Sequence, residues 1–123
     1  MNNHLNESIM KKWKIGIVGT GMIADFHAKA VESLPNAQLM GFSNIRSEKA
    51  VTMAKKYGVK SWDSISSMLQ ADEIDIVMIA TPSGAHMEPT VEAAMNGKHV
   101  LCEKPLEIKL DRIDRMIKAH AHS

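Results

Sequence analysis

Short apolar runs alternate with segments of helical spacing along this sequence, and the alternation restricts the fold more than any other feature. The run at 74–81, IDIVMIAT, is the most apolar and is rich in β-branched residues, which is typical of a parallel strand covered on both faces. Similar runs lie at 13–18, 37–43 and 98–103. Helical segments follow the four runs at 22–34, 47–58, 83–97 and 110–121, and 59–70 holds a short strand and a short helix. This order predicts an α/β fold, a doubly wound parallel sheet with helices on both faces.

Capping residues and spacing predict how individual helices begin, end and face the core. Ser47 is expected to be the N-cap of the helix at 47–58, and Gly58 its end. Asn96 and Gly97 close the helix at 83–97, where Pro89 is tolerated only near the first turn. The apolar residues at helical spacing in 22–34 are Ile23, Phe26, Ala30, Val31 and Leu34.

Length and composition indicate a single globular domain. The chain has 123 residues, 45% of them hydrophobic and 24% charged, a balance that argues against disorder. A formal net charge of +1 leaves no electrostatic footprint for a nucleic-acid partner. No apolar run approaches the roughly 20 residues that span a bilayer, so no membrane partner is expected. We expect residues 1–12 to form a flexible extension and 13–123 to form the domain.

The only cysteine and the N-terminal segment bear on location. Cys102 cannot form an internal disulfide, and the first residues lack the apolar stretch of a secretory signal. Both features favour a cytoplasmic location. Cys102 itself is expected to be a small buried strand residue, since its neighbours are apolar.

The stretch GTGMIA at 19–24 follows a predicted strand and opens a predicted helix, as a dinucleotide-binding fingerprint requires. Gly19 would permit the tight turn, Gly21 would let a pyrophosphate approach the backbone, and Ala24 would keep helix and strand close. Backbone N–H groups of the helix that begins near Met22 and Ile23 would hold the phosphates. The alternative is a glycine-rich turn that binds nothing.

The end of the second strand bears on the choice between NAD and NADP. The fingerprint expects an acid about 20 residues after the loop, at the ribose hydroxyls. Here Ser43 and Asn44 occupy that place, so no carboxylate repels a 2′-phosphate, and Arg46 could pair with one. These residues favour NADP over NAD. Alternatively, Arg46 is a solvated loop charge and Asn44 a cap or turn residue.

Two longer motifs, DIVMIATPSGAH and AAMNGKHVLCEKP, together with GIVGTGMIADFHAKA, resemble the N-terminal domain of the glucose–fructose oxidoreductase/inositol dehydrogenase/rhizopine-catabolism (Gfo/Idh/MocA) family. The resemblance implies a Rossmann-type fold that binds NAD or NADP. It places Thr81, Pro82 and Ser83 beside the cofactor at the end of the fourth strand, where ligands of such sheets bind. His86 matches the family's histidine, although a histidine there is more often a packing residue than a catalyst. Pro82 and Ser83 also suit a turn and a helix cap.

The stretch Glu103-Lys104-Pro105 carries the implied chemistry. In the family this lysine reaches the nicotinamide and the reacting hydroxyl, so the resemblance makes Lys104 the catalytic residue for a sugar or polyol substrate, with Glu103 orienting it. Desolvation near a positive nicotinamide would lower the lysine pKa and suit acid–base work. The alternative is a surface charge that caps a strand. No residue is assigned to a metal.

The sequence departs from the family after Ser123, because members continue into a C-terminal α+β domain that supplies most of the substrate pocket. We therefore expect a fragment, a truncated family member or one part of an assembly that does not turn over substrate alone. Two other functions stay open: a stand-alone module that senses NAD(P)H, and a truncation product without catalysis. An uncovered sheet edge and apolar surface predict self-association or a homo-oligomer.

Overall fold

A computed structural model describes residues 12–81 and 87–102 of the chain. Five parallel strands form one sheet in the order β3-β2-β1-β4-β5. The strands are β1 (Trp13–Val18), β2 (Ala37–Ser43), β3 (Lys60–Ser61), β4 (Ile76–Ile79) and β5 (His99–Cys102). Each strand expected from the sequence is present. The chain adds β2 and β3 on one side of β1 and then β4 and β5 on the other, so the direction of strand order reverses at β1, as in a doubly wound sheet.

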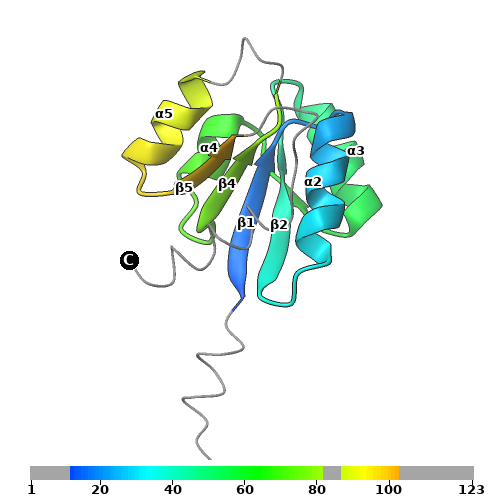
Figure 1. Cartoon of the computed structure of the whole chain (residues 1–123). Helices are drawn as coiled ribbons and strands as arrows, with labels where there is room; N and C mark the ends of the chain where they lie inside the picture. The colour runs from blue at the N-terminus through cyan, green and yellow to red at the C-terminus, as the bar shows by residue number, and fades with distance from the viewer. Residues whose placement is uncertain (1–11, 82–86, 103–123) are drawn as a thin grey trace, which may run out of the picture.

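Helices cover both faces of this sheet, so the predicted fold class is confirmed (Figure 1). One face carries α2 (Met22–Glu32) and α3 (Ser47–Tyr57), and the other carries α4 (Ile65–Leu69) and α5 (Met87–Met95). The beginning of the expected helix at 83–97 and the whole of that at 110–121 lie outside the described residues. No helix within the described ranges is long and apolar enough to cross a membrane.

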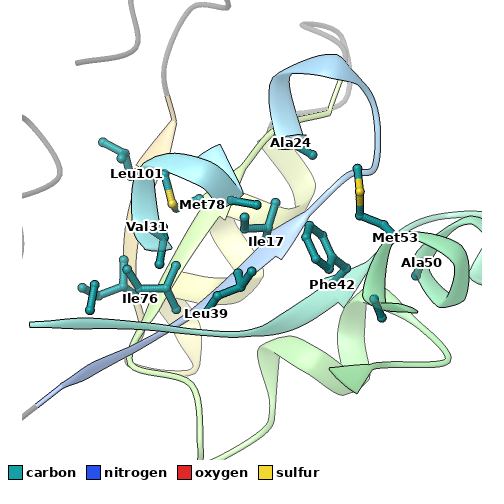
Figure 2. Packing of buried hydrophobic residues seen from close by; sticks show 14 residues of the cluster. Ile17, Ala24, Val31, Leu39, Phe42, Ala50, Met53, Ile76, Met78 and Leu101 are labelled. Atoms are coloured by element: carbon teal, nitrogen blue, oxygen red, sulfur yellow. The ribbon is translucent and has the colours of Figure 1, made fainter. Parts of the chain in front are cut away.

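Two apolar clusters hold the helices to the sheet. Ile15 and Ile17 of β1 pack with Ile76 and Met78 of β4 on the α2 face, where Figure 2 shows Ile17 and Met78 beneath the helix. The alternate residues of β1 and β4, such as Val77, pack on the α4 face with Met68. Both strands are therefore buried on both sides, which explains why they have no polar alternation.

The inner face of α2 differs from the one expected from spacing. Its buried residues are Ala24, His27, Ala28 and Val31, whereas Phe26 is 57% exposed. These four residues recur at i, i+3, i+4 and i+7 and form one stripe along the helix, and Phe26 lies on the opposite, solvent-facing side. The expectation that Phe26 belongs to the core was wrong.

The start of α3 also differs by one residue. Its N-cap is Arg46, which has an extended backbone and makes no capping bond through its side chain, and Ser47 is the first helical residue. The helix ends as expected at Gly58, whose φ of 65° is left-handed. Gly97 has a φ of 73° after α5, which fits the predicted end of that helix.

Strand β2 carries an irregularity that decides which way its last side chains point. Ile15 is paired with Leu39 but Gly16 with Gly41, so Met40 is an extra residue. Leu39 and Phe42 consequently share the α2 face, although they lie three residues apart. Without the extra residue, period-2 alternation would place residue 43 on the face of Leu39.

Candidate functional site

The loop after β1 lies between the carboxyl ends of β2 and β4. Gly19 has a φ of 114°, and a β-carbon there would come within 2.6 Å of the Ala80 carbonyl oxygen. Its N–H donates a 2.8 Å hydrogen bond to the Ser43 carbonyl. Only glycine meets both conditions, the left-handed backbone and the close approach. The loop is thereby fixed at the point where strand order reverses, which is where such sheets bind ligands.

The N-terminus of α2 presents uncapped backbone donors next to this loop. Gly21 is the N-cap with an extended backbone, and no side chain caps the helix. A β-carbon on Gly21 would meet no atom within 4 Å, so the space beside it is open. The first N–H groups of any helix lack internal partners, and the positive end of the helix dipole favours an anion. Loop and helix together fit the pyrophosphate of a dinucleotide.

The three residues expected to contact the adenosine ribose lie near one another, but they differ in burial and in the bonds that their side chains already make. Ser43 is fully buried, and its hydroxyl is 3.4 Å from the Met68 sulfur on the α4 side, a placement that follows from the irregularity in β2. The Asn44 amide donates to the Arg46 carbonyl at 3.2 Å, which stabilises the turn into α3. Only the Arg46 side chain is exposed to solvent.

A pocket that the sequence reading missed lies between the glycine loop and α3. Its volume is about 390 Å³, and its lining residues are Thr20, Lys49, Thr52, Met53 and Lys56. Two lysines give its α3 wall a basic character. A signal existed in the sequence: the two lysines are seven residues apart in the predicted helix, a spacing that puts them on one face.

Beside this pocket, Asp25 in the first turn of α2 binds three groups. Lys56 lies 2.8 Å from one carboxylate oxygen and Lys29 lies 3.2 Å from the other. The Tyr57 hydroxyl donates to the carboxylate as well. The bonds from Lys56 and Tyr57 hold the pKa of Asp25 well below its usual range. Burial, and then the neighbouring carboxylate, raise the pKa of Tyr57.

Besides binding Asp25 of α2, Tyr57 packs against the end of β2, the strand that holds the glycine loop. Its ring lies 5.7 Å from that of Phe42, centroid to centroid. Phe42 immediately precedes Ser43, whose carbonyl holds Gly19. The glycine loop, α2 and α3 are thus joined through one aromatic residue at the end of α3.

His27 is the other unusual group near the site. It is fully buried on the inner face of α2, and neither ring nitrogen has a hydrogen-bond partner in the described part of the chain. Burial lowers the pKa of His27 from 6.5 to about 4, because a charged ring would be desolvated. At neutral pH the imidazole is therefore uncharged.

Thr81 follows Ala80 at the end of β4 and is half-buried, one residue beyond the carbonyl that meets Gly19. The remaining expected site residues, Pro82, Ser83, His86, Glu103 and Lys104, lie outside the described ranges. In residues 12–81 and 87–102, no group of three or more His, Cys, Asp or Glu residues could hold a metal ion.

Comparison with known proteins gives the same assignment as the loop geometry. Residues 13–123 match the family described as an oxidoreductase family with an NAD-binding Rossmann fold (GFO_IDH_MocA). Glucose-6-phosphate 3-dehydrogenase of Bacillus subtilis is 38% identical over 84% of this chain and 29% of its own length. The scyllo-inositol 2-dehydrogenase (NAD(+)) of the same organism is 32% identical over 80% of this chain and 29% of its own length.

A solved structure agrees at the level of the backbone. The biliverdin reductase of Synechocystis, determined with biliverdin and NADP+, superposes with a TM-score of 0.69 and 28% identity, covering 87% of this chain and 35% of that protein. The chain spans about a third of the length of the relatives it matches. On its family match and its parallel sheet, this chain belongs to the Gfo/Idh/MocA oxidoreductase family and carries that family's NAD-binding Rossmann fold.

Proposed function

We propose that this chain binds a nicotinamide dinucleotide as the cofactor domain of an oxidoreductase that acts on a hydroxyl or carbonyl group of a sugar or polyol. The observation that carries the proposal is the Gly19 turn, held between Ser43 and Ala80 at the first strand–helix junction. Relatives named as sugar and inositol dehydrogenases support the substrate class.

Each part of the loop has a role in this proposal. Gly19 holds the turn, Gly21 leaves room for the pyrophosphate, and the N–H groups at Met22 and Ile23 donate to its oxygens. The Thr81 to Ser83 stretch, with His86, would border the nicotinamide half. The bound nicotinamide would supply the hydride chemistry, while the protein orients both reactants.

Lys104 is the residue we propose for proton handling. It follows the last residue of β5 by two positions in the sequence, and β5 ends at the same carboxyl edge of the sheet as the glycine loop. A lysine at this edge would donate a proton to a substrate carbonyl or accept one from a hydroxyl, with Glu103 orienting its ammonium group. We further propose that the chain alone does not turn over substrate.

We propose NADP(H) as the preferred cofactor. The end of β2 offers no carboxylate at Ser43 or Asn44, and the exposed Arg46 guanidinium is free to approach a phosphate from solvent. The basic pocket, about 390 Å³ in volume, adds Lys49, which lines it together with Thr20 of the glycine loop. A 2′-phosphate is a dianion at neutral pH, and a pair of cations favours it over a ribose hydroxyl.

Titration of the purified chain with NADPH and with NADH tests these statements together. Nicotinamide fluorescence reports binding directly, and any bound cofactor raises the melting temperature by mass action. Tighter binding of NADPH is expected. Tighter binding of NADH would keep the glycine loop and discard the preference. If a folded chain bound neither, the cofactor proposal would fail.

We also propose that the chain self-associates in the cytoplasm. Several large apolar side chains are exposed in the described residues, and they include Met22, Phe26, Ile45, Val91 and Met95. The single cysteine suits a reducing compartment. Light scattering at rising concentration should give a mass that grows beyond one chain, and a sharp monomer peak at high concentration would contradict self-association.

A further inference from the structure

We propose that Asp25 is a specificity-determining residue that weakens the preference for a 2′-phosphorylated dinucleotide by engaging Lys56 at the wall of the basic pocket. The inference rests on the proposed function, since it concerns the cofactor that the pocket would take. It assigns a role to a carboxylate that belongs to α2 and is not itself a lining residue of the pocket.

The pocket has two lysines, and their surroundings differ. Lys56 lines the pocket and at the same time places its ammonium group 2.8 Å from the Asp25 carboxylate. Lys49 lines the pocket from the same face of α3, two turns earlier, and is exposed. A phosphate entering the pocket therefore meets one lysine whose charge is largely compensated and one whose charge is not.

Asp25 is held firmly in this arrangement. The Tyr57 hydroxyl and Lys29 both bind its carboxylate, and its side chain is only 23% exposed. The same contacts keep the carboxylate ionised across the physiological range. The negative charge thus stays next to Lys56 whether or not a ligand is present, and it repels an approaching phosphate.

The substitution Asp25→Asn removes this negative charge and keeps the size and polarity of the side chain. Lys56 is then free to pair with a phosphate in the pocket. We expect the ratio of NADPH affinity to NADH affinity to rise about five- to tenfold at low salt, and the gain to shrink as salt screens it. The affinity for NADH should change little, because NADH has no phosphate at this position.

Matched variants separate this effect from a general loss of structure. Glu32→Gln removes the same charge from α2 at an exposed position two turns away, and Tyr57→Phe removes a bond to Asp25 but leaves both charges in place. Neither should raise the ratio. In a Lys56→Gln background, Asp25→Asn should raise the ratio clearly less than in wild type, because the released lysine is missing and only the direct repulsion between carboxylate and phosphate is relieved.

The measurement is a set of paired titrations with NADPH and NADH on wild type and variants, with unfolding temperatures recorded to compare folded fractions. A ratio that rises in Asp25→Asn, and rises clearly less when the same substitution is made in the Lys56→Gln background, supports the proposal. An unchanged or lower ratio overturns it, as does equal weakening of both cofactors, which would make Asp25 purely structural. If the wild-type chain binds neither cofactor, the proposed function fails, and this inference fails with it.

Discussion

Gly19 lies against the backbone of Ala80, so that a β-carbon at residue 19 would stand 2.6 Å from the Ala80 carbonyl oxygen. This contact joins the end of β1 to the end of β4. With the bond from the Gly19 N–H to the Ser43 carbonyl, it fixes the loop across three neighbouring strands. The geometry of the loop is therefore a property of the sheet as much as of its own sequence.

Substitutions at the two loop glycines should separate folding from binding. Gly19→Ala introduces both a clash and an unfavourable φ, so we expect a loss of about 2–4 kcal/mol of stability together with cofactor binding. Gly21→Ala meets open space at an allowed backbone conformation, so stability should change by less than about 0.5 kcal/mol. Binding should still weaken, because the added methyl group obstructs the pyrophosphate.

Urea denaturation and NADPH titration of both variants check these expectations. Wild-type affinity in Gly21→Ala would mean that the phosphates do not approach that residue. Wild-type stability in Gly19→Ala would mean that the loop rearranges around the alanine.

The proposed role of positive charge in cofactor preference can be tested at Lys49, which lines the basic pocket, and at Arg46, the N-cap of α3. Lys49→Ala and Arg46→Ala should each weaken NADPH binding about three- to tenfold and leave NADH binding nearly unchanged. Lys55→Ala is the matched control, because Lys55 is an exposed lysine on the same helix that does not line the pocket. Fluorescence titrations at low and moderate salt give both affinities. An unchanged cofactor preference in Arg46→Ala would remove Arg46 from the site.

Buried His27 predicts a specific dependence of stability on pH. Its folded pKa of about 4 lies below the unfolded value of 6.5, so between these values the unfolded chain binds more protons. Stability is thus fully present above pH 6.5 and falls as the pH drops towards 4, by about 3 kcal/mol in total. The pKa of Asp25 is lowered, so the stability that this carboxylate contributes is lost in a more acidic range, as the pH falls through and below the usual carboxyl pKa.

The substitution His27→Leu should flatten the curve in this window and raise stability at neutral pH, since two unpaired buried nitrogens are removed. Urea denaturation at half-unit pH steps is the measurement. A wild-type slope that persists in His27→Leu would assign the titration to another group.

Close packing at Gly41 predicts a position where alanine is not tolerated. A β-carbon there would lie 2.0 Å from the Lys60 carbonyl oxygen, so β2 and β3 would have to separate. We expect Gly41→Ala to cost about 2–4 kcal/mol. Gly16→Ala should cost about 1 kcal/mol, because its β-carbon meets the end of the flexible Met68 side chain at 2.9 Å. Unfolding in urea with both variants side by side tests the contrast.

Much of the fold was predictable from local patterns. The runs at 13–18 and 37–43 became β1 and β2 with the expected bounds, because continuously apolar or alternating spacing is a property of neighbouring residues. The run at 74–81 was longer than β4, Ile76–Ile79, because apolar residues alone do not show where the hydrogen-bonded pairing with the neighbouring strands begins and ends. The glycine loop was recognisable because it must follow a strand and open a helix.

The composition of the site was less predictable. The Asn44 side chain forms a turn, and Ser43 points towards Met68, because one extra residue in β2 reverses the alternation before the strand ends. Nothing in the local spacing reveals that extra residue. The pocket and the Asp25–Tyr57 bond join residues far apart in the sequence, and their distance depends on how α2 and α3 dock on the sheet.

The sequence by itself determined the order of strands and helices along the chain, the α/β class and the position of the glycine loop, because these follow from periodicity and from the few backbone conformations that glycine alone adopts. The tertiary structure decided which side chains reach the site. Phe26 lies outside and His27 inside because of the face with which α2 docks on the sheet. Lys56 meets Asp25 because α2 and α3 lie side by side. Contacts of this kind depend on packing between elements, which no local pattern encodes.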